Sequence, residues 1–128
     1  AAVLAGFMVF RPVTSPVSQP VAILSASDGQ SQFIVSASAD SRTLTVSGLN
    51  VPAAHTHSLQ LWLLKDNAAP VSLGLLDTTP VVLTLNTRTL KQPVRLAVSQ
   101  EPKGGAPGSL PTGPVIYTGA ITRGVEGI

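Results

Sequence analysis

The sequence predicts an all-β protein, an antiparallel β-sandwich of about eight short strands. From Val21 onward, apolar residues recur with a period of two, which is typical of strands with one buried face. Turn-forming dipeptides such as Asp28-Gly29 separate these apolar segments. No segment after residue 20 carries a helical apolar stripe long enough to compete with this pattern. We therefore expect an immunoglobulin-like sandwich, with any helix confined to the N-terminal residues.

The first part of the predicted sandwich consists of a strand and a hairpin. Residues 21–27 form the strand, which ends at the Asp28-Gly29 turn. Residues 32–38 and 42–48 alternate apolar and polar side chains on either side of a polar turn, which predicts an antiparallel hairpin. Ser and Thr, rather than Lys and Glu, occupy its solvent side.

A continuous apolar run, Leu61-Trp62-Leu63-Leu64, distinguishes residues 58–65 from the other predicted strands. Such a run fits a strand that is covered on both faces, so we expect this strand to lie centrally. The remaining strands are predicted at residues 71–76, 81–85, 94–100 and 115–120.

Residues 1–10 contain no polar side chain. A membrane-spanning helix needs about 20 apolar residues, but the chain does not begin with Met. We interpret residues 1–11 as the end of a transmembrane helix. A first strand and an apolar helix docked on the domain remain alternatives. If this segment is ordered in solution, its apolar surface must be covered, and we then expect a dimer or larger homo-oligomer.

Proline recurs at positions 12, 16 and 20, where it prevents a helix and favours an extended spacer. We interpret residues 12–20 as a stalk, residues 21–122 as the folded domain and residues 123–128 as a tail.

The composition excludes several classes of protein. Only 11% of the residues are charged, against about 25% in an average soluble domain. Low charge with ordinary hydrophobicity argues against disorder. The absence of cysteine excludes a disulfide scaffold or a zinc–thiolate site. The net charge of +2 comes from scattered Lys and Arg residues, which argues against nucleic-acid binding.

His55 and His57 form the only candidate metal-binding pair. In an extended segment both imidazoles would point to the same side, but a metal site usually needs three or four ligands. No Gly-x-Ser-x-Gly motif is present, and four of the six acidic residues lie in apparent turns. We therefore expect no enzymatic activity and no cofactor.

Glu101 differs from the other acidic residues because it joins an apolar strand to a Pro- and Gly-rich loop. Its carboxylate would accept backbone N–H bonds from the loop that follows, or would bind Arg95 or Lys103. The Gly104-Gly105 pair permits positive φ angles in this loop. We favour a structural role for Glu101 over binding of a ligand.

Four motifs follow one another along the chain: LQLWLL at residues 59–64, VSLGLL at 71–76, LAVSQEPKGGAP at 96–107 and PTGPVIYTG at 111–119. In order and spacing they resemble the motifs of the C-terminal domain of anti-sigma-K-type factors. The resemblance covers about residues 21–119. The residues that match the signature, to which we assign structural roles, are Leu61, Trp62, Ser72, Leu73, Gly74, Glu101, Pro102, Gly104, Gly105, Pro107, Pro111, Thr112, Gly113, Pro114 and Gly119.

This resemblance implies the periplasmic domain of a regulator that spans the bacterial inner membrane. A cytoplasmic N-terminal domain would precede these residues and hold an extracytoplasmic-function sigma factor inactive. A transmembrane helix would connect the two domains, and stepwise proteolysis, beginning with an extracytoplasmic protease, would release the sigma factor. Two alternatives remain open, a stand-alone immunoglobulin-like binding or adhesion module and a small metal-binding protein that uses His55 and His57.

Overall fold

The computed structural model describes residues 19–38, 42–53, 56–77, 79–84 and 95–121. The regular secondary structure in these ranges consists entirely of β-strands. The strands are β1 (Gln19–Ala26), β2 (Gln32–Ala37), β3 (Thr43–Leu49), β4 (His57–Leu64), β5 (Val71–Leu75), β6 (Val81–Thr84), β7 (Arg95–Pro102) and β8 (Val115–Ala120). The predicted all-β antiparallel fold is confirmed, and each predicted strand has a counterpart within a few residues.

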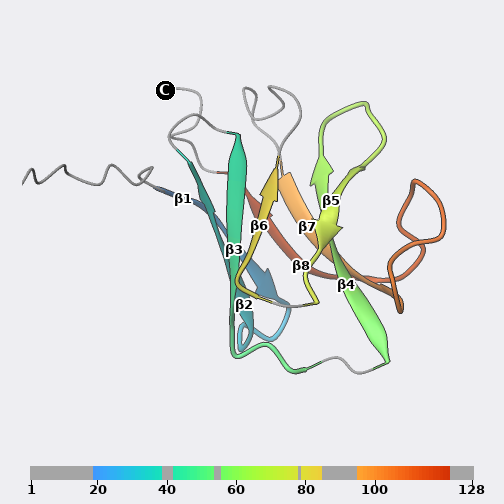
Figure 1. Ribbon diagram of the computed structural model, residues 1–128, viewed down its shortest axis with the longest axis horizontal. Coiled ribbons are helices and arrows are strands. Elements are labelled where there is room, and N and C mark those ends of the chain that lie inside the picture. Colours follow the sequence, from blue (N-terminus) through green and yellow to red (C-terminus); the bar gives the residue numbers. More distant parts are fainter. Residues whose placement is uncertain (1–18, 39–41, 54–55, 78, 85–94, 122–128) are drawn as a thin grey trace, which may run out of the picture.

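All eight strands belong to one nearly closed antiparallel sheet with the order β5-β4-β7-β8-β1-β2-β3-β6 (Figure 1). The edge strands β5 and β6 approach each other at Gly74, where a Cβ atom would lie 2.8 Å from Leu83 Cδ2. The division into two immunoglobulin-like sheets stays a prediction.

The β1–β2–β3 meander forms because its turn residues lie between segments in which apolar and polar side chains alternate. Gly29 has a φ of 72°, a conformation that glycine adopts readily, and Asp28 Oδ1 accepts a 2.8 Å hydrogen bond from Gln30 N. The inward side chains of the hairpin include Phe33 and Leu44, which are fully buried. Phe33 packs edge-on against Tyr117 of β8 with ring centroids 4.9 Å apart, which links the hairpin to the other end of the chain.

The prediction that residues 58–65 form a central strand is wrong in one respect. β4 is second from the edge of the sheet, between β5 and β7. It is nevertheless buried on both faces: Leu59, Leu61 and Leu63 belong to the apolar core, and the opposite face is buried as well. Position in the sheet and burial are separate properties, because a loop can cover the outer face of a strand near the edge.

Residues 1–18 and 122–128 lie outside the described ranges, as do the transmembrane helix and most of the stalk predicted there. Among the described residues, no helix has the length and apolar character needed to span a membrane.

The backbone of β8 lies close against that of β1 at Gly119, next to the Ser25–Thr118 pair of their antiparallel ladder. A Cβ atom at position 119 would overlap the carbonyl oxygen of Ile23 and would lie 2.9 Å from Leu24 Cδ2. Gly108, in an exposed loop, has no atom within 4 Å of the equivalent position.

We predict that Gly119→Ala lowers the free energy of unfolding by about 1–3 kcal/mol, because β8 must move away from β1 to admit the methyl group. Gly108→Ala, the matched control, should change it by less than about 0.5 kcal/mol. Urea denaturation of both variants measures the difference, and equal stabilities would contradict the close approach of β8 to β1.

Candidate functional site

A layer of polar side chains lies on the outer face of β4 and β7. Alternation along a strand places successive side chains on opposite faces, so the positions between the core leucines of β4 point outward. The antiparallel register pairs Ser58 with Glu101 and Gln60 with Ser99 across the two strands. All four residues are at least 92% buried, although they lie on the face away from the core.

The loop between β7 and β8, residues 103–114, covers this layer. We refer to it as the covering loop. Figure 1 shows it beside β4 and β7, on the opposite side of the molecule from β1–β3. It is held on the sheet by hydrogen bonds to side chains of β4 and β7 and by backbone hydrogen bonds to Gln100 and Pro102 of β7. The outer face of these strands is therefore buried by the chain itself.

Glu101 makes the largest number of these contacts. Its Oε1 accepts hydrogen bonds from Thr112 Oγ1 at 2.6 Å and from Thr112 N at 3.1 Å. Its Oε2 accepts from Ser99 Oγ at 2.5 Å and from Gly113 N at 3.3 Å. These donors are neutral hydroxyl and backbone N–H groups. Arg95 and Lys103, the predicted alternative partners, are exposed and make no ion pair with Glu101 in the described structure.

Burial and hydrogen bonding act in opposite directions on the pKa of Glu101. Loss of hydration, the larger single effect, raises the pKa because it disfavours the charged form. The hydrogen bonds from Ser99, Thr112 and Gly113 together outweigh this effect and hold the pKa below the ordinary value of 4.5. Glu101 is therefore a buried carboxylate that stays ionised at neutral pH.

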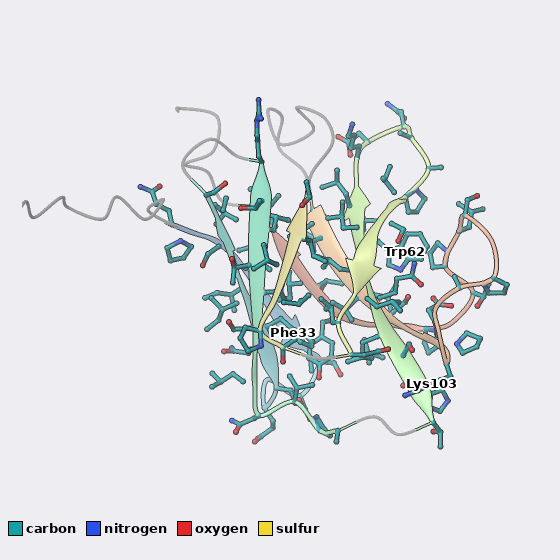
Figure 2. The ribbon with its side chains drawn as sticks, in the orientation of Figure 1. Phe33, Trp62 and Lys103 are labelled. Carbon is teal, nitrogen blue, oxygen red and sulfur yellow. The ribbon has the colours of Figure 1, made fainter. Side chains whose placement is uncertain are left out.

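Trp62 extends this network into the sheet. Its indole Nε1–H donates a 2.9 Å hydrogen bond to Ser99 Oγ, and Ser99 in turn donates to Glu101. Trp62 is 1% exposed, and Figure 2 shows it on the β4 side of the molecule, opposite the labelled Phe33. The chain of donors fixes the hydroxyl of Ser99 in one orientation and aligns it with the carboxylate.

Gln60 holds the first half of the covering loop. Its Oε1 accepts a 2.8 Å hydrogen bond from Ala106 N, and its Nε2 donates a 2.7 Å bond to Ser72 Oγ on β5. One buried amide therefore joins three segments of the chain.

Ser58 makes a second connection. Its hydroxyl donates to Asp77 Oδ2 at 3.0 Å and accepts from Gly104 N at 2.8 Å. Asp77 also accepts from Leu59 N at 3.4 Å, a longer contact. The loop is thus attached at Gly104 and Ala106 near its start and at Thr112 and Gly113 near its end.

Glycines allow the loop backbone to come this close. Gly104 and Gly105 have φ angles of 96° and 107°, as the sequence analysis predicts for this pair. At Gly113 a Cβ atom would overlap the carbonyl oxygen of Gln100, so no other residue fits without displacement of the loop.

The structure brings seven of the fifteen signature residues predicted from the sequence into this site. Trp62, Glu101, Thr112 and Gly113 share one hydrogen-bond network, and Ser72, Gly104 and Gly105 belong to the neighbouring contacts. The other eight take no part in these side-chain contacts. Leu61 is in the core, Leu73 packs against it, and Gly74 and Gly119 mark close approaches between strands. The prolines in or next to the covering loop, Pro102, Pro107, Pro111 and Pro114, are exposed or half-buried.

Of the candidate histidine pair, only His57 lies among the described residues, and it is not part of this site. His55 lies outside the described residues, and His57 is exposed, with its Nδ1 2.9 Å from Thr56 Oγ1. The described residues contain no group of three or more His, Asp or Glu side chains arranged to hold a metal ion.

Sequence reasoning missed the roles of Ser58, Gln60 and Ser99, and it assigned Asp77 only to a turn. The available signal was the regular spacing of Ser58, Gln60 and Trp62, which places polar groups at every second position of an otherwise apolar strand. A polar residue at such a position requires a partner when it is buried.

The polar side chains on this outer face bond to one another, to Ser72 and Asp77, or to the covering loop. Such an arrangement holds the covering loop in one conformation. The protein is thus an all-β domain in which the covering loop is fixed to the sheet by buried hydrogen bonds.

The family model described as anti-sigma-K factor rskA, C-terminal, matches residues 1–115. The chain therefore belongs to this family and is an anti-sigma factor regulatory domain, and the resemblance inferred from the four motifs is confirmed. Comparisons with curated proteins and with solved structures gave no match.

We predict that Glu101→Gln lowers the free energy of unfolding by at least about 2 kcal/mol, because an amide nitrogen cannot accept the hydrogen bonds that one carboxylate oxygen accepts. Asp66→Asn makes the same chemical change at an exposed turn and should cost less than about 0.5 kcal/mol. Chemical denaturation of both variants tests this, and a Glu101→Gln variant as stable as the control would show that the network does not stabilise the fold.

Stability should also depend on pH through Glu101. Its pKa is lower in the folded than in the unfolded chain, so between the two values only the unfolded chain binds a proton. The stabilisation is complete above the unfolded pKa and is lost as the pH falls through the folded pKa. Urea midpoints measured from neutral pH to well below 4.5 should fall more steeply for the wild type than for Glu101→Gln. Parallel curves would argue against an ionised Glu101.

Proposed function

We propose that this chain is the extracytoplasmic sensor domain of a membrane-spanning anti-sigma factor, which controls an extracytoplasmic-function sigma factor through regulated proteolysis. The observation that carries the proposal is the family match over residues 1–115. The sequence adds an apolar segment at residues 1–10 followed by a Pro-rich segment at 12–20, the order expected of a membrane boundary and a stalk.

In this proposal the folded domain shields the Pro-rich segment from a protease. Exposed, extended segments are the preferred sites of cleavage. β1 begins at Gln19 and is paired with both β2 and β8, so the described fold begins where the Pro-rich segment ends. A stimulus that loosens the sheet would free β1 and make the adjoining segment accessible.

The covering loop provides a connection through which a change at Glu101 would affect β1. The covering loop connects β7 to β8, and β8 pairs with β1. Loss of the Glu101 network would release the start of β8 and weaken its pairing with β1.

The full-length protein carrying Trp62→Ala tests this mechanism in cells. The substitution removes a buried indole and should cost about 3–5 kcal/mol. We expect more cleavage product on an immunoblot and more transcription from a sigma-dependent promoter. Leu110→Ala, the matched control, truncates an apolar side chain that is 50% exposed and should change neither. If Trp62→Ala is destabilised in vitro but leaves cleavage and transcription unchanged, shielding by the fold is wrong.

A further inference from the structure

The fold gathers at one end of the sheet basic residues that are scattered in the sequence. Neighbouring strands are antiparallel throughout, so the odd-numbered strands begin and the even-numbered strands end at this same end. Arg42 directly precedes β3, Lys65 directly follows β4, and Arg95 is the first residue of β7. We refer to the end that these three residues define as the basic end. Figure 1 shows the loop between β4 and β5, which begins with Lys65, at the top of the view and the start of β4 at the bottom.

The basic side chains reach the surface. Arg42 and Arg95 are exposed, and Lys65 is half-buried. Lys65 and Arg95 lie on neighbouring strands, because Arg95 is paired with Leu64, the residue before Lys65. Asp66 is the one acidic residue that the structure describes at this end.

The opposite end carries the opposite charge. Asp28 lies in the turn between β1 and β2, Asp77 follows β5, and the ionised Glu101 lies at the end of β7. Lys103 is the one basic residue described at that end. Counted over the described residues, the net charge is +2 at the basic end and −2 at the opposite end. The domain is therefore an electric dipole along its strands, and such a dipole orients a protein in an external field.

The chain also enters the fold at the basic end. β1 begins there at Gln19, and only residues 11–18 separate it from the apolar residues 1–10. Eight residues span at most about 30 Å when they are fully extended. If residues 1–10 adjoin a membrane, as in the proposed function, the bilayer is the surface beside which the chain holds the basic end.

We propose that the basic end binds the anionic phospholipid headgroups of this membrane. The presence of the membrane beside the domain rests on the proposed function, whereas the affinity of the basic end for anionic lipid does not. Each Lys or Arg near an anionic membrane surface strengthens binding by about fivefold, and Asp66 offsets one such contribution. The short connection to the membrane raises the effective concentration of the domain, so even this weak affinity holds it at the surface.

The dipole and the connection favour the same orientation. The negative end, with Asp28 and Asp77, is repelled by anionic headgroups and points away from the bilayer. In this orientation residues 11–18 lie between the domain and the membrane, where a protease has the least access.

Binding of the whole 128-residue chain to lipid vesicles tests the inference. We expect the partition coefficient to be at least about tenfold higher for vesicles of equal parts phosphatidylglycerol and phosphatidylcholine than for pure phosphatidylcholine. The difference should disappear at about 0.5 M salt, because salt screens the attraction. Residues 1–10 contribute to the binding of both kinds of vesicle, so the ratio of the two partition coefficients isolates the effect of charge.

Three variants that each remove one positive charge separate the position of the charge from the net charge. Lys65→Gln and Arg95→Gln should each lower the ratio about fivefold. Lys103→Gln, the matched control at the opposite end, should lower it less than about twofold, because Lys103 points away from the bilayer. Circular dichroism identifies which variants are folded, and the two basic-end variants on different strands provide independent tests.

A wild-type ratio near one would overturn the inference, because the basic end would then have no affinity for anionic lipid. So would equal losses in Lys103→Gln and in both folded basic-end variants, since the net charge alone would then be responsible. Failure of the proposed function would look different. If the basic end binds anionic vesicles but Trp62→Ala leaves cleavage in cells unchanged, lipid binding stands and shielding by the fold is wrong.

Discussion

The carboxylate of Glu101 is buried without a cationic partner in the described structure. Its negative charge is stabilised by neutral hydrogen-bond donors from two separate parts of the chain. Burial of an unpartnered carboxylate would be strongly unfavourable. Ser99 is already in place on the same strand, but Thr112 and Gly113 become available only when residues 103–114 fold back over the sheet. The requirement to satisfy one charge therefore fixes the position of the whole loop and the start of β8.

This constraint explains why residues far apart in the sequence form one signature. Trp62 orients Ser99, Gly113 lets the backbone approach Glu101, and Gly104 and Gly105 supply the positive φ angles that turn the chain back over β4. Each residue has an evident structural reason, and none of these reasons involves a ligand. A domain whose characteristic residues hold its own fold together is consistent with regulation through stability, as proposed for this member of the anti-sigma factor family.

The strands could be predicted from the sequence because their inward positions follow a period of two and their turns contain Asp-Gly and Asp-Asn pairs. For Glu101 the sequence left two kinds of partner open, loop N–H groups and the side chains of Arg95 or Lys103, and the structure shows the loop N–H groups. The position of β4 in the sheet could not be predicted, because an apolar run indicates that a strand is buried but not which segment covers it. The hydrogen-bond partners of Ser58, Gln60 and Ser99 could not be predicted either. The register between strands and the path of the covering loop are determined by contacts between residues distant in sequence.

The covering loop is an integral part of the fold, held in place by Glu101 and its neighbours. Amide hydrogen exchange, measured by NMR on the wild-type chain, tests this residue by residue. The N–H groups of Gly104, Ala106, Thr112 and Gly113 donate to buried side chains and should exchange as slowly as the amides of the β4–β7 ladder. Exchange of these four amides at the rate of an unstructured peptide, while the ladder amides stay protected, would show that the covering loop is not held on the sheet.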